Sequence, residues 1–367
     1  MVDVRDFDFD LPAELIAQEP AADRAAARLL CLDRRRGRVQ HRVVRDLPGL
    51  LGDGDVLVVN NTRVFPARLL GRREPSGGAV ECLLIGRLEE GVGRGFPAEP
   101  AENPSRPLFE LWEALMHTGQ RLGPGARVVF DGAPALHGEV VDRRFHGRRA
   151  IRLWTSDGSP VDTAVDAIGH VPLPPYIRRA DRTDDRERYQ TVFATERGSV
   201  AAPTAGLHLS TAVISELTSR GVGIVQITLH VGYGTFQPVR VERVEDHRLE
   251  PERFEIGELA AADINRALDE GRRVIAVGTT TTRTLETVAR GHGGRIVAGA
   301  GTTDLFIYPG FAFRVVGGLL TNFHLPRSSL LMLVAAFAGR DRVIEAYAAA
   351  VREGYRFYSY GDAMLII

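Results

Sequence analysis

The sequence contains no lysine, so all 46 of its Lys and Arg residues are arginine. This absence excludes a Schiff-base lysine, a Walker-type phosphate lysine and a lysine general base. Any recognition of phosphate in this chain must therefore use the planar guanidinium fork of arginine.

Cysteine is scarce and long apolar runs are missing. Cys31 and Cys82 are the two cysteines, and they form no recognisable metal or redox pattern, which suits a reducing compartment. No apolar run is long enough to span a membrane, and the acidic N-terminus MVDVRDFDFD has no signal-peptide pattern. We therefore expect a cytoplasmic protein.

The net charge of the chain is also small. A formal net charge of −1 argues against a general nucleic-acid coat protein, which would be strongly basic. It leaves room for an enzyme that contacts RNA through a local basic patch.

Common catalytic and cofactor motifs are absent. Gly232–Gly234 begins a G-x-G pattern, but Gln237 stands where the dinucleotide fingerprint needs its third glycine, which argues against a Rossmann cofactor site. There is no P-loop, no G-x-S-x-G and no H-E-x-x-H, and the histidines are too scattered to suggest zinc. We expect no metal and no prosthetic group.

The pattern of the chain changes near residue 156. Between residues 71 and 153 the expected strands are short and punctuated by glycine, which is typical of a small barrel. After residue 156 helical and strand segments alternate, which predicts a mostly parallel sheet with helices on its faces. The expected fold is a three-layer α/β/α sandwich domain formed by residues 1–63 and 156–367, with a small β-barrel domain inserted at residues 64–155.

The segment VIAVGTTTTRTLE, Val274–Glu286, carries four consecutive threonines between an apolar run and a helix-compatible run. Threonine is a poor helix former but a good cap, so the segment predicts a strand, a tight turn and a helix. The hydroxyls and the first free N–H groups of such a helix suit an anion or a hydroxyl-rich ligand. The alternative is an ordinary helix cap.

Other polar loops follow strands or precede helices. They are Asn60–Arg63 (NNTR), Ala202–His208 (APTAGLH), His230–Phe236 (HVGYGTF) and Thr321–Ser329 (TNFHLPRSS). Ligands in α/β folds bind at the carboxyl ends of the strands. We therefore expect several of these loops to converge with the threonine run around one pocket.

Four histidines are candidates for acid–base chemistry: His208, His230, His247 and His324. His208 and His324 are the more attractive, because each lies in a Thr/Asn/Gly loop just before an expected helix. Each could equally be a hydrogen-bonded structural histidine. Asn60, Asn61 and Asn322 are candidate readers of a sugar or base edge, and their alternative role is in turns.

Arginine clusters occur at residues 34–45, 143–152 and 178–188. Each cluster taken alone is typical of a solvated protein face whose arginines form ion pairs within the chain. Because all three flank the expected domain junctions, an RNA-facing rim is a further hypothesis.

Taken together, several long segments resemble one family. They include VVNNTRVFPARLLGR, GHVPLPPYI, AAPTAGLHL, TLHVGYGTFQPVR, VIAVGTTTTRTLE, LLTNFHLPRSSLLMLVAAFAG and YRFYSYGDAMLI, in family order from Asp6 to Ile367. The family is that of the S-adenosylmethionine:tRNA ribosyltransferase-isomerases of the queuosine pathway. The resemblance implies the same fold, an α/β domain with an inserted barrel.

The resemblance also implies a reaction. The ribosyl part of S-adenosylmethionine, a co-substrate, moves to the aminomethyl group of a 7-deazaguanine at the wobble position of tRNA. It is isomerised to an epoxycyclopentane, giving epoxyqueuosine with release of adenine and methionine. The implied partners are this tRNA and S-adenosylmethionine, with no membrane, and we expect a monomer.

Such chemistry assigns roles to the candidates as hypotheses. A base must remove a proton beside the sulfonium, and His208 or His324 is assigned to proton transfer. Asp362 and Asp304 are reserve carboxylates. The groups expected to hold the methionine carboxylate or the ribose hydroxyls are Thr280, Thr281, Thr282, Arg283 and Asn322, and those expected to orient the modified base or its phosphate are Asn60, Asn61 and Arg63. Thr204 is a further residue expected to bind substrate.

The chain departs from the family pattern at two positions. Glu250 stands where the family commonly has the second histidine of D-H-x-x-H, and Tyr233 lies between two glycines where a small residue is common. Two other functions remain open: a non-catalytic tRNA-binding protein of the same fold, and a methyltransferase using the same cofactor. The products distinguish them, since methyl transfer leaves S-adenosylhomocysteine and a binding protein leaves the cofactor intact.

Overall fold

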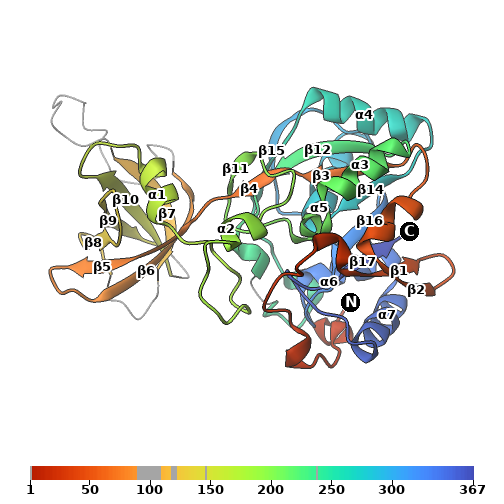
Figure 1. Ribbon diagram of the computed structural model, residues 1–367, viewed down its shortest axis with the longest axis horizontal. Helices are drawn as coiled ribbons and strands as arrows, with labels where there is room; N and C mark the ends of the chain where they lie inside the picture. The colour runs from red at the N-terminus through yellow and green to blue at the C-terminus, as the bar shows by residue number, and fades with distance from the viewer. Residues whose placement is uncertain (1, 89–108, 117–121, 145–146, 237–238) are drawn as a thin grey trace. The chain divides into compact units, whose positions relative to one another are not determined.

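A computed structural model describes residues 2–88, 109–116, 122–144, 147–236 and 239–367 (Figure 1). The chain divides into two compact units. Unit 1 comprises Met1–Arg63, Pro174–Ala180 and Glu187–Ile367, and unit 2 comprises Val64–Leu173 and Asp181–Arg186. The domain limits predicted from the sequence, residues 1–63 with 156–367 and residues 64–155, remain a prediction.

Unit 1 is built on a nine-stranded sheet in the order β15-β13-β12-β3-β14-β16-β17-β1-β2. Its strands are β1 (Arg28–Asp33), β2 (Arg38–Val43), β3 (Val56–Asn60), β12 (Gly223–Leu229), β13 (Glu252–Ile256), β14 (Val274–Val277), β15 (Gly299–Thr303), β16 (Val316–Asn322) and β17 (Ala363–Ile366). The four central strands β12, β3, β14 and β16 run parallel to one another. Antiparallel pairs flank them, including β16 with β17 and β12 with β13.

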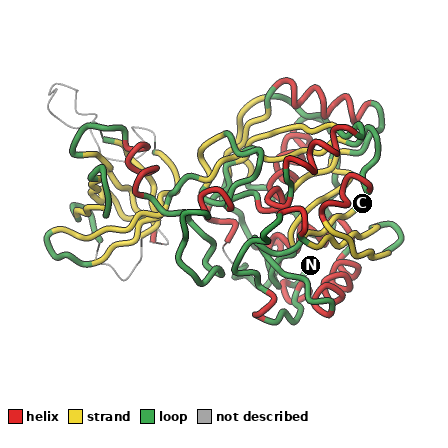
Figure 2. The backbone as a smooth tube through the Cα atoms, in the orientation of Figure 1, coloured by secondary structure: helices red, strands yellow, loops and turns green. Residues whose placement is uncertain are grey.

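Helices cover both faces of this sheet (Figure 2). They are α3 (Thr211–Ser219), α4 (Glu258–Asp269), α5 (Thr279–Gly291), α6 (Ser329–Ala338) and α7 (Arg340–Arg352), with shorter 3₁₀ helices that include η3 (Arg24–Ala26), η4 (Val44–Gly49), η6 (Thr204–His208) and η7 (Tyr233–Phe236). The short helix α2 (Asp185–Arg188) spans the point in the sequence where unit 2 ends, at Arg186, and unit 1 resumes, at Glu187.

Alternation along the strands explains the layers. In β3, Val56 and Val58 pack into a core with residues of α4, α5, α6 and α7, whereas Leu57 and Val59 pack into a second core with α3 and η4. Successive side chains of a strand point to opposite faces, so a strand such as VLVVN, apolar except for its last residue, is buried on both sides. The expected three-layer α/β/α arrangement is confirmed.

The direction of the strands brings the polar loops together. Because β12, β3, β14 and β16 are parallel, their carboxyl ends meet at one edge of the sheet. His230, Asn60, Gly278 and Asn322 stand at or just beyond these ends. β17 runs antiparallel to β16 with Ala363 opposite Asn322, so the segment before β17 reaches the same edge.

Unit 2 contains a closed antiparallel barrel with the strand order β10-β7-β6-β5-β8-β9, which confirms the expected barrel. Its strands are β5 (Arg68–Glu74), β6 (Ala79–Arg87), β7 (Glu110–Met116), β8 (Arg127–Phe130), β9 (Leu136–Arg143) and β10 (Arg148–Thr155), with α1 (Val161–Ile168) following. Buried residues alternate along β7 and β9, as expected when alternate side chains fill a small barrel.

A separate two-stranded sheet pairs β4 (Thr62–Val64) with β11 (Glu196–Ser199). Across the part of the chain that the structure describes, no helix is both long and apolar enough to cross a bilayer.

Candidate functional site

A pocket lies in unit 1 at the carboxyl edge of the parallel strands. It encloses about 540 Å³, including its open mouth. Its wall is formed by the loops after β14 and β16, the loop around η6 and the segment before β17; the polar residues on it are Tyr176, Thr204, Thr279, Thr280, Thr321, Asn322, His324, Tyr358 and Ser359.

The threonine run forms one side of this pocket through its first two members. Gly278 has φ +91°, a conformation that suits glycine, and it turns the chain from β14 directly into α5. Gly278, the N-cap of α5, has no side chain with which to cap the helix, and Thr279 and Thr280 line the pocket. The first N–H groups of the helix are thus available to an anion.

Thr281 and Thr282, in contrast, lie inside the helix packing. The Thr281 hydroxyl donates to the carbonyl of Val277 at 2.8 Å and the Thr282 hydroxyl donates to the carbonyl of Gly278 at 3.1 Å. Neither lines the pocket. Back-bonding of this kind satisfies a buried hydroxyl within its own helix.

Asn322, the last residue of β16, presents a buried amide to the pocket. Its Nδ2 donates to the carbonyl of Tyr358 at 2.9 Å and contacts Nε2 of His208 at 3.1 Å. The carbonyl can only accept, which fixes the orientation of the amide. Among the described residues, Asn322 Oδ1 has no hydrogen-bond partner, and a buried acceptor in this state calls for a ligand or water.

The two favoured histidines occupy different positions. His324 lines the pocket, and its Nε2 lies 2.9 Å from the Thr321 hydroxyl. The backbone N–H of His324 donates a hydrogen bond to the hydroxyl of Tyr347. His208 lies behind Asn322, at the wall of a neighbouring hollow. Burial lowers the pKa of His324 to about 3 and, with help from the charges of Arg356 and Arg24, that of His208 to about 4. Both imidazoles are therefore neutral near pH 7.

Aromatic residues supply a wall that the sequence reasoning did not single out. The rings of Tyr176 and Tyr358 meet edge to face with centroids 3.8 Å apart, and the Tyr176 hydroxyl is hydrogen-bonded to Ser359. Tyr358 has φ +76°, an uncommon conformation for a bulky residue and one often found at functional sites. YRFYSYGD gave an aromatic signal, but only the fold places it beside Asn322.

Asn60 and Asn61 serve the backbone of unit 1 rather than the pocket. Asn60 donates to the carbonyl of Leu229 at 2.9 Å and accepts from the N–H groups of Leu229 and Thr62. Asn61 accepts from the Thr228 hydroxyl at 2.7 Å, and Arg63 is exposed. The turn role that was their alternative matches these contacts.

Arg283, one turn beyond Thr279, forms a buried ion pair with Glu252 of β13. The other carboxylate oxygen of Glu252 accepts the N–H of Gly232 at 2.9 Å. The pair therefore anchors the HVGYGTF loop to α5. Arg283 does not line the pocket.

The other two candidate histidines and the two reserve carboxylates either contact neighbouring residues of the protein or lie exposed at its surface. His230 contacts the Thr62 hydroxyl through Nδ1 at 2.9 Å, and His247 packs against Phe306. Asp362 accepts the backbone N–H groups of Arg28 and Arg356. Asp304 is exposed.

Neither departure from the family pattern lies on the wall of the pocket. Glu250 packs against Gly234, where an added Cβ would stand 3.2 Å from the carboxylate. Tyr233 begins η7 and is partly buried. Among the described residues, no group of three His, Cys, Asp or Glu side chains could hold a metal ion.

Most members of the three arginine clusters have internal partners. Arg36 pairs with Asp33 and Arg45 with Asp23, while Arg144 and Arg148 share Glu113. Arg179 pairs with Glu19. Arg188 differs, since its guanidinium donates to the backbone carbonyls of Ala21 and Ala22.

Comparison with known proteins agrees with this architecture. The family model described as "Queuosine biosynthesis protein" matches residues 4–366. The S-adenosylmethionine:tRNA ribosyltransferase-isomerase of Heliobacterium modesticaldum is 49% identical over 98% of both chains, and that of Desulfitobacterium hafniense is 48% identical over 99% of both.

A solved structure is also similar. The S-adenosylmethionine tRNA ribosyltransferase of Thermotoga maritima is 36% identical, with a TM-score of 0.54, and the match covers 99% of this chain and 100% of that one. The chain belongs to the queuosine biosynthesis family of S-adenosylmethionine:tRNA ribosyltransferase-isomerases.

Proposed function

We propose that this protein transfers the ribosyl part of S-adenosylmethionine to the aminomethyl group of 7-aminomethyl-7-deazaguanine at the wobble position of tRNA. The ribosyl group is isomerised on the way, giving epoxyqueuosine in tRNA, adenine and methionine. Family membership supports the reaction. The observation that carries the site is that Asn322 lines the pocket and that its buried Oδ1 has no partner among the described residues.

We assign Asn322 to the binding of S-adenosylmethionine, from which its side-chain oxygen would accept a hydrogen bond. A ribose hydroxyl or the adenine amino group would satisfy its free oxygen. A site built to pair a substrate donor rejects analogues that lack the donor, because the buried acceptor is then left unsatisfied. The rings of Tyr176 and Tyr358, both on the pocket wall, offer an aromatic surface for the adenine ring.

The start of α5 is assigned to the methionine carboxylate. Thr279 and Thr280, the first two residues of α5, line the pocket. The positive end of the helix dipole favours a carboxylate there. Thr204, on the opposite loop, completes the hydroxyl-lined wall.

His324 is assigned to proton transfer. Because its pKa lies at about 3, the imidazole is neutral and able to accept the proton from the carbon beside the sulfonium, which the positive sulfur acidifies. The imidazolium so formed is a strong acid in this buried place, and it can return the proton to the departing adenine. The low pKa makes His324 a weak base, so the acidity of the sulfonium carbon has to supply much of the driving force.

His208 is assigned a positioning role. It touches Asn322 and not the pocket. A neutral imidazole with its proton on Nδ1 accepts from Asn322 Nδ2, which keeps the amide oxygen turned away from His208.

The protein is proposed to act as a monomer. Light scattering of the active preparation would test that point. A tRNA substrate supports a cytoplasmic location for the reaction.

One incubation tests the function. Purified protein is mixed with S-adenosylmethionine and tRNA that carries the aminomethyl-deazaguanine, and the products are read by mass spectrometry. Adenine, methionine and epoxyqueuosine must appear together. S-adenosylhomocysteine would instead indicate a methyltransferase, and an intact cofactor with bound tRNA would indicate a binding protein.

A further inference from the structure

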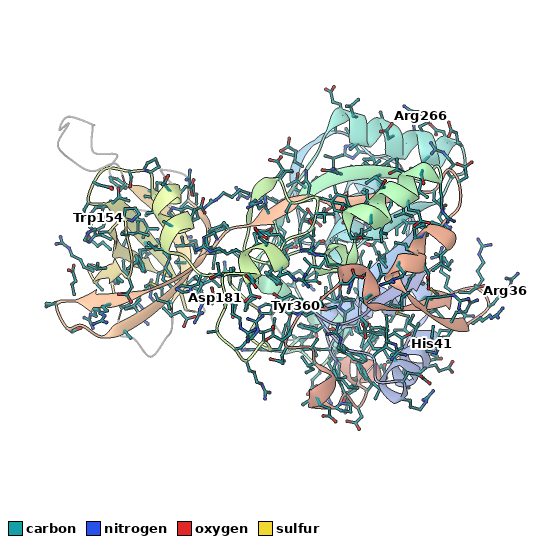
Figure 3. All side chains as sticks on the ribbon, in the orientation of Figure 1. Arg36, His41, Trp154, Asp181, Arg266 and Tyr360 are labelled. Carbon is teal, nitrogen blue, oxygen red and sulfur yellow. The ribbon has the colours of Figure 1, made fainter. Side chains whose placement is uncertain are left out.

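A second hollow adjoins the first in unit 1 and has no role in the chemistry assigned so far. It encloses about 320 Å³, including its open mouth, and its wall includes Arg24, Arg188, His208, Ser359 and Tyr360. Tyr360 is labelled in Figure 3. Ser359 belongs to the walls of both hollows, and the contact between His208 and Asn322 links them. A ligand in one hollow therefore lies beside a ligand in the other.

Two arginines give this hollow its charge. Arg24 donates to the carbonyls of Gln190 and Glu187 at 2.7 and 3.1 Å, and Arg188 donates to those of Ala22, at 3.2 Å, and Ala21. Both side chains are half-buried. Backbone carbonyls hold the guanidinium groups in place but bring no negative charge.

Two of the nearby acids are engaged in other ion pairs. Asp23 pairs with Arg45 at 3.0 Å, and Glu19 pairs with Arg179 at 3.0 Å. Within the described ranges, neither Arg24 nor Arg188 has an ion pair with a carboxylate. Burial and the charge of Arg188 both lower the pKa of Arg24.

Two like charges held together in a half-buried hollow are unfavourable unless an anion offsets them. An arginine kept only for structure is normally paired or solvated. This arrangement therefore indicates an anion that enters with the substrate.

The chemistry of the hollow selects the kind of anion. The carboxylate of methionine carries an ammonium on the neighbouring carbon, which Arg24 and Arg188 would repel. A phosphodiester has no such companion charge, and arginine recognises phosphate with its planar fork. Phosphate contacts fix the register of a nucleic acid on a protein, which is what a base entering the neighbouring pocket requires.

We propose that Arg24 and Arg188 hold a backbone phosphate of the RNA substrate, next to the nucleotide that enters the pocket. This inference rests on the proposed function for the identity of the RNA. It adds a built anchor for the phosphate chain that the family relationship does not specify.

The test uses the double variant R24Q/R188Q of the full chain and an anticodon stem-loop RNA that carries the aminomethyl-deazaguanine. Affinity is measured by fluorescence anisotropy over a series of salt concentrations, without S-adenosylmethionine. We expect RNA affinity to fall about tenfold and the salt dependence to become shallower by about 0.7–0.9, the contribution of one neutralised phosphate. The KM for S-adenosylmethionine stays unchanged. R352Q, which removes an exposed charge from α7, is the matched control and keeps the wild-type affinity and slope.

Unchanged RNA affinity and salt slope in the folded double variant would overturn the proposal. A raised KM for S-adenosylmethionine with normal RNA binding would also overturn it and reassign the hollow to the carboxylate. If the double variant does not fold, the variant R24K/R188K provides the test, because it keeps both positive charges but lacks the planar guanidinium forks. We expect it to bind RNA more weakly with an unchanged salt slope. Wild-type affinity in this variant would contradict recognition of phosphate by the arginine forks. Because binding is read without turnover, an RNA that binds but releases no adenine would refute the proposed function and leave the phosphate site standing.

Discussion

The amide of Asn322 stands between the imidazole of His208 and the carbonyl of Tyr358, at 3.1 and 2.9 Å from its Nδ2. These contacts use both N–H bonds of the amide. Its oxygen remains for the pocket. Three segments far apart in the sequence thus set the direction of one hydrogen-bond acceptor.

Replacing His324 with alanine should lower the single-turnover rate of adenine release about 10²–10⁴-fold, the usual contribution of a positioned base. The affinity for S-adenosylmethionine should change little. Exchange of the proton beside the sulfonium with deuterated solvent is the sharper measurement, since it reports removal of that proton alone. Exchange at the wild-type rate in a folded H324A protein would place the base elsewhere.

Replacing His208 with alanine should lower turnover about tenfold, the effect of losing one hydrogen bond that orients a binding group. H208Q can still accept from Asn322 through its amide oxygen and should recover most of the rate. The proton exchange that depends on His324 should persist in both variants. Equal loss in H208A and H208Q, together with loss of exchange, would show that His208 itself transfers the proton.

Acid should destabilise the protein through the same two histidines. Their pKa values in the folded state, about 4 and about 3, lie below the ordinary value of 6.5. As pH falls below 6.5 the unfolded chain binds protons that the folded chain does not, so stability falls with pH. Each histidine contributes roughly 1.4 kcal/mol per pH unit until its folded pKa is reached.

Urea unfolding between pH 6.5 and 5 measures this slope above the range where most carboxylates titrate. H324Q should remove about half of the contribution of the pair. A free energy of unfolding that stays constant across this interval would show that the two imidazoles take up protons in the folded state.

The parallel core of the sheet explains what the sequence could reveal. Short apolar strands followed by NNTR, HVGYGTF, GTTTTR and TNFH predicted polar loops at one edge, and the structure brings Thr280, Asn322 and His324 to one pocket. Periodicity cannot say which way an individual side chain turns. Thr281 and Thr282 bond back into α5, and Asn60 is used by the backbone of β12.

The parts that the sequence could not predict depend on distant contacts. Tyr176 and Tyr358 meet only because a segment 182 residues away in the numbering folds beside β16. Arg188 belongs to a recognised arginine cluster, but its companion Arg24 lies in an unremarkable N-terminal stretch. No local pattern links such pairs.

Replacing only one member of the buried ion pair between Arg283 and Glu252 should strongly destabilise the protein. R283M or E252Q alone leaves the other group buried without its partner, at a cost of about 3–5 kcal/mol in the free energy of unfolding. The double variant R283M/E252Q should cost less than the sum of the two single changes. Denaturant unfolding of all four proteins completes the cycle, and simple additivity would contradict direct coupling of the pair.

Gly278 offers the most local test of the start of α5. Its φ of +91° is unfavourable for any residue with a Cβ, although the nearest atoms to an added Cβ stand 3.7 Å away. G278A should therefore cost about 1–3 kcal/mol of stability through backbone strain alone. The strain should also shift Thr279 and Thr280 and raise the KM for S-adenosylmethionine. G291A, at the far end of the same helix with no atom near the added Cβ, should be neutral or slightly stabilising. Thermal unfolding and KM measured on both variants separate the two ends of α5, and equal behaviour of G278A and G291A would show that the turn into the helix does not hold the cofactor.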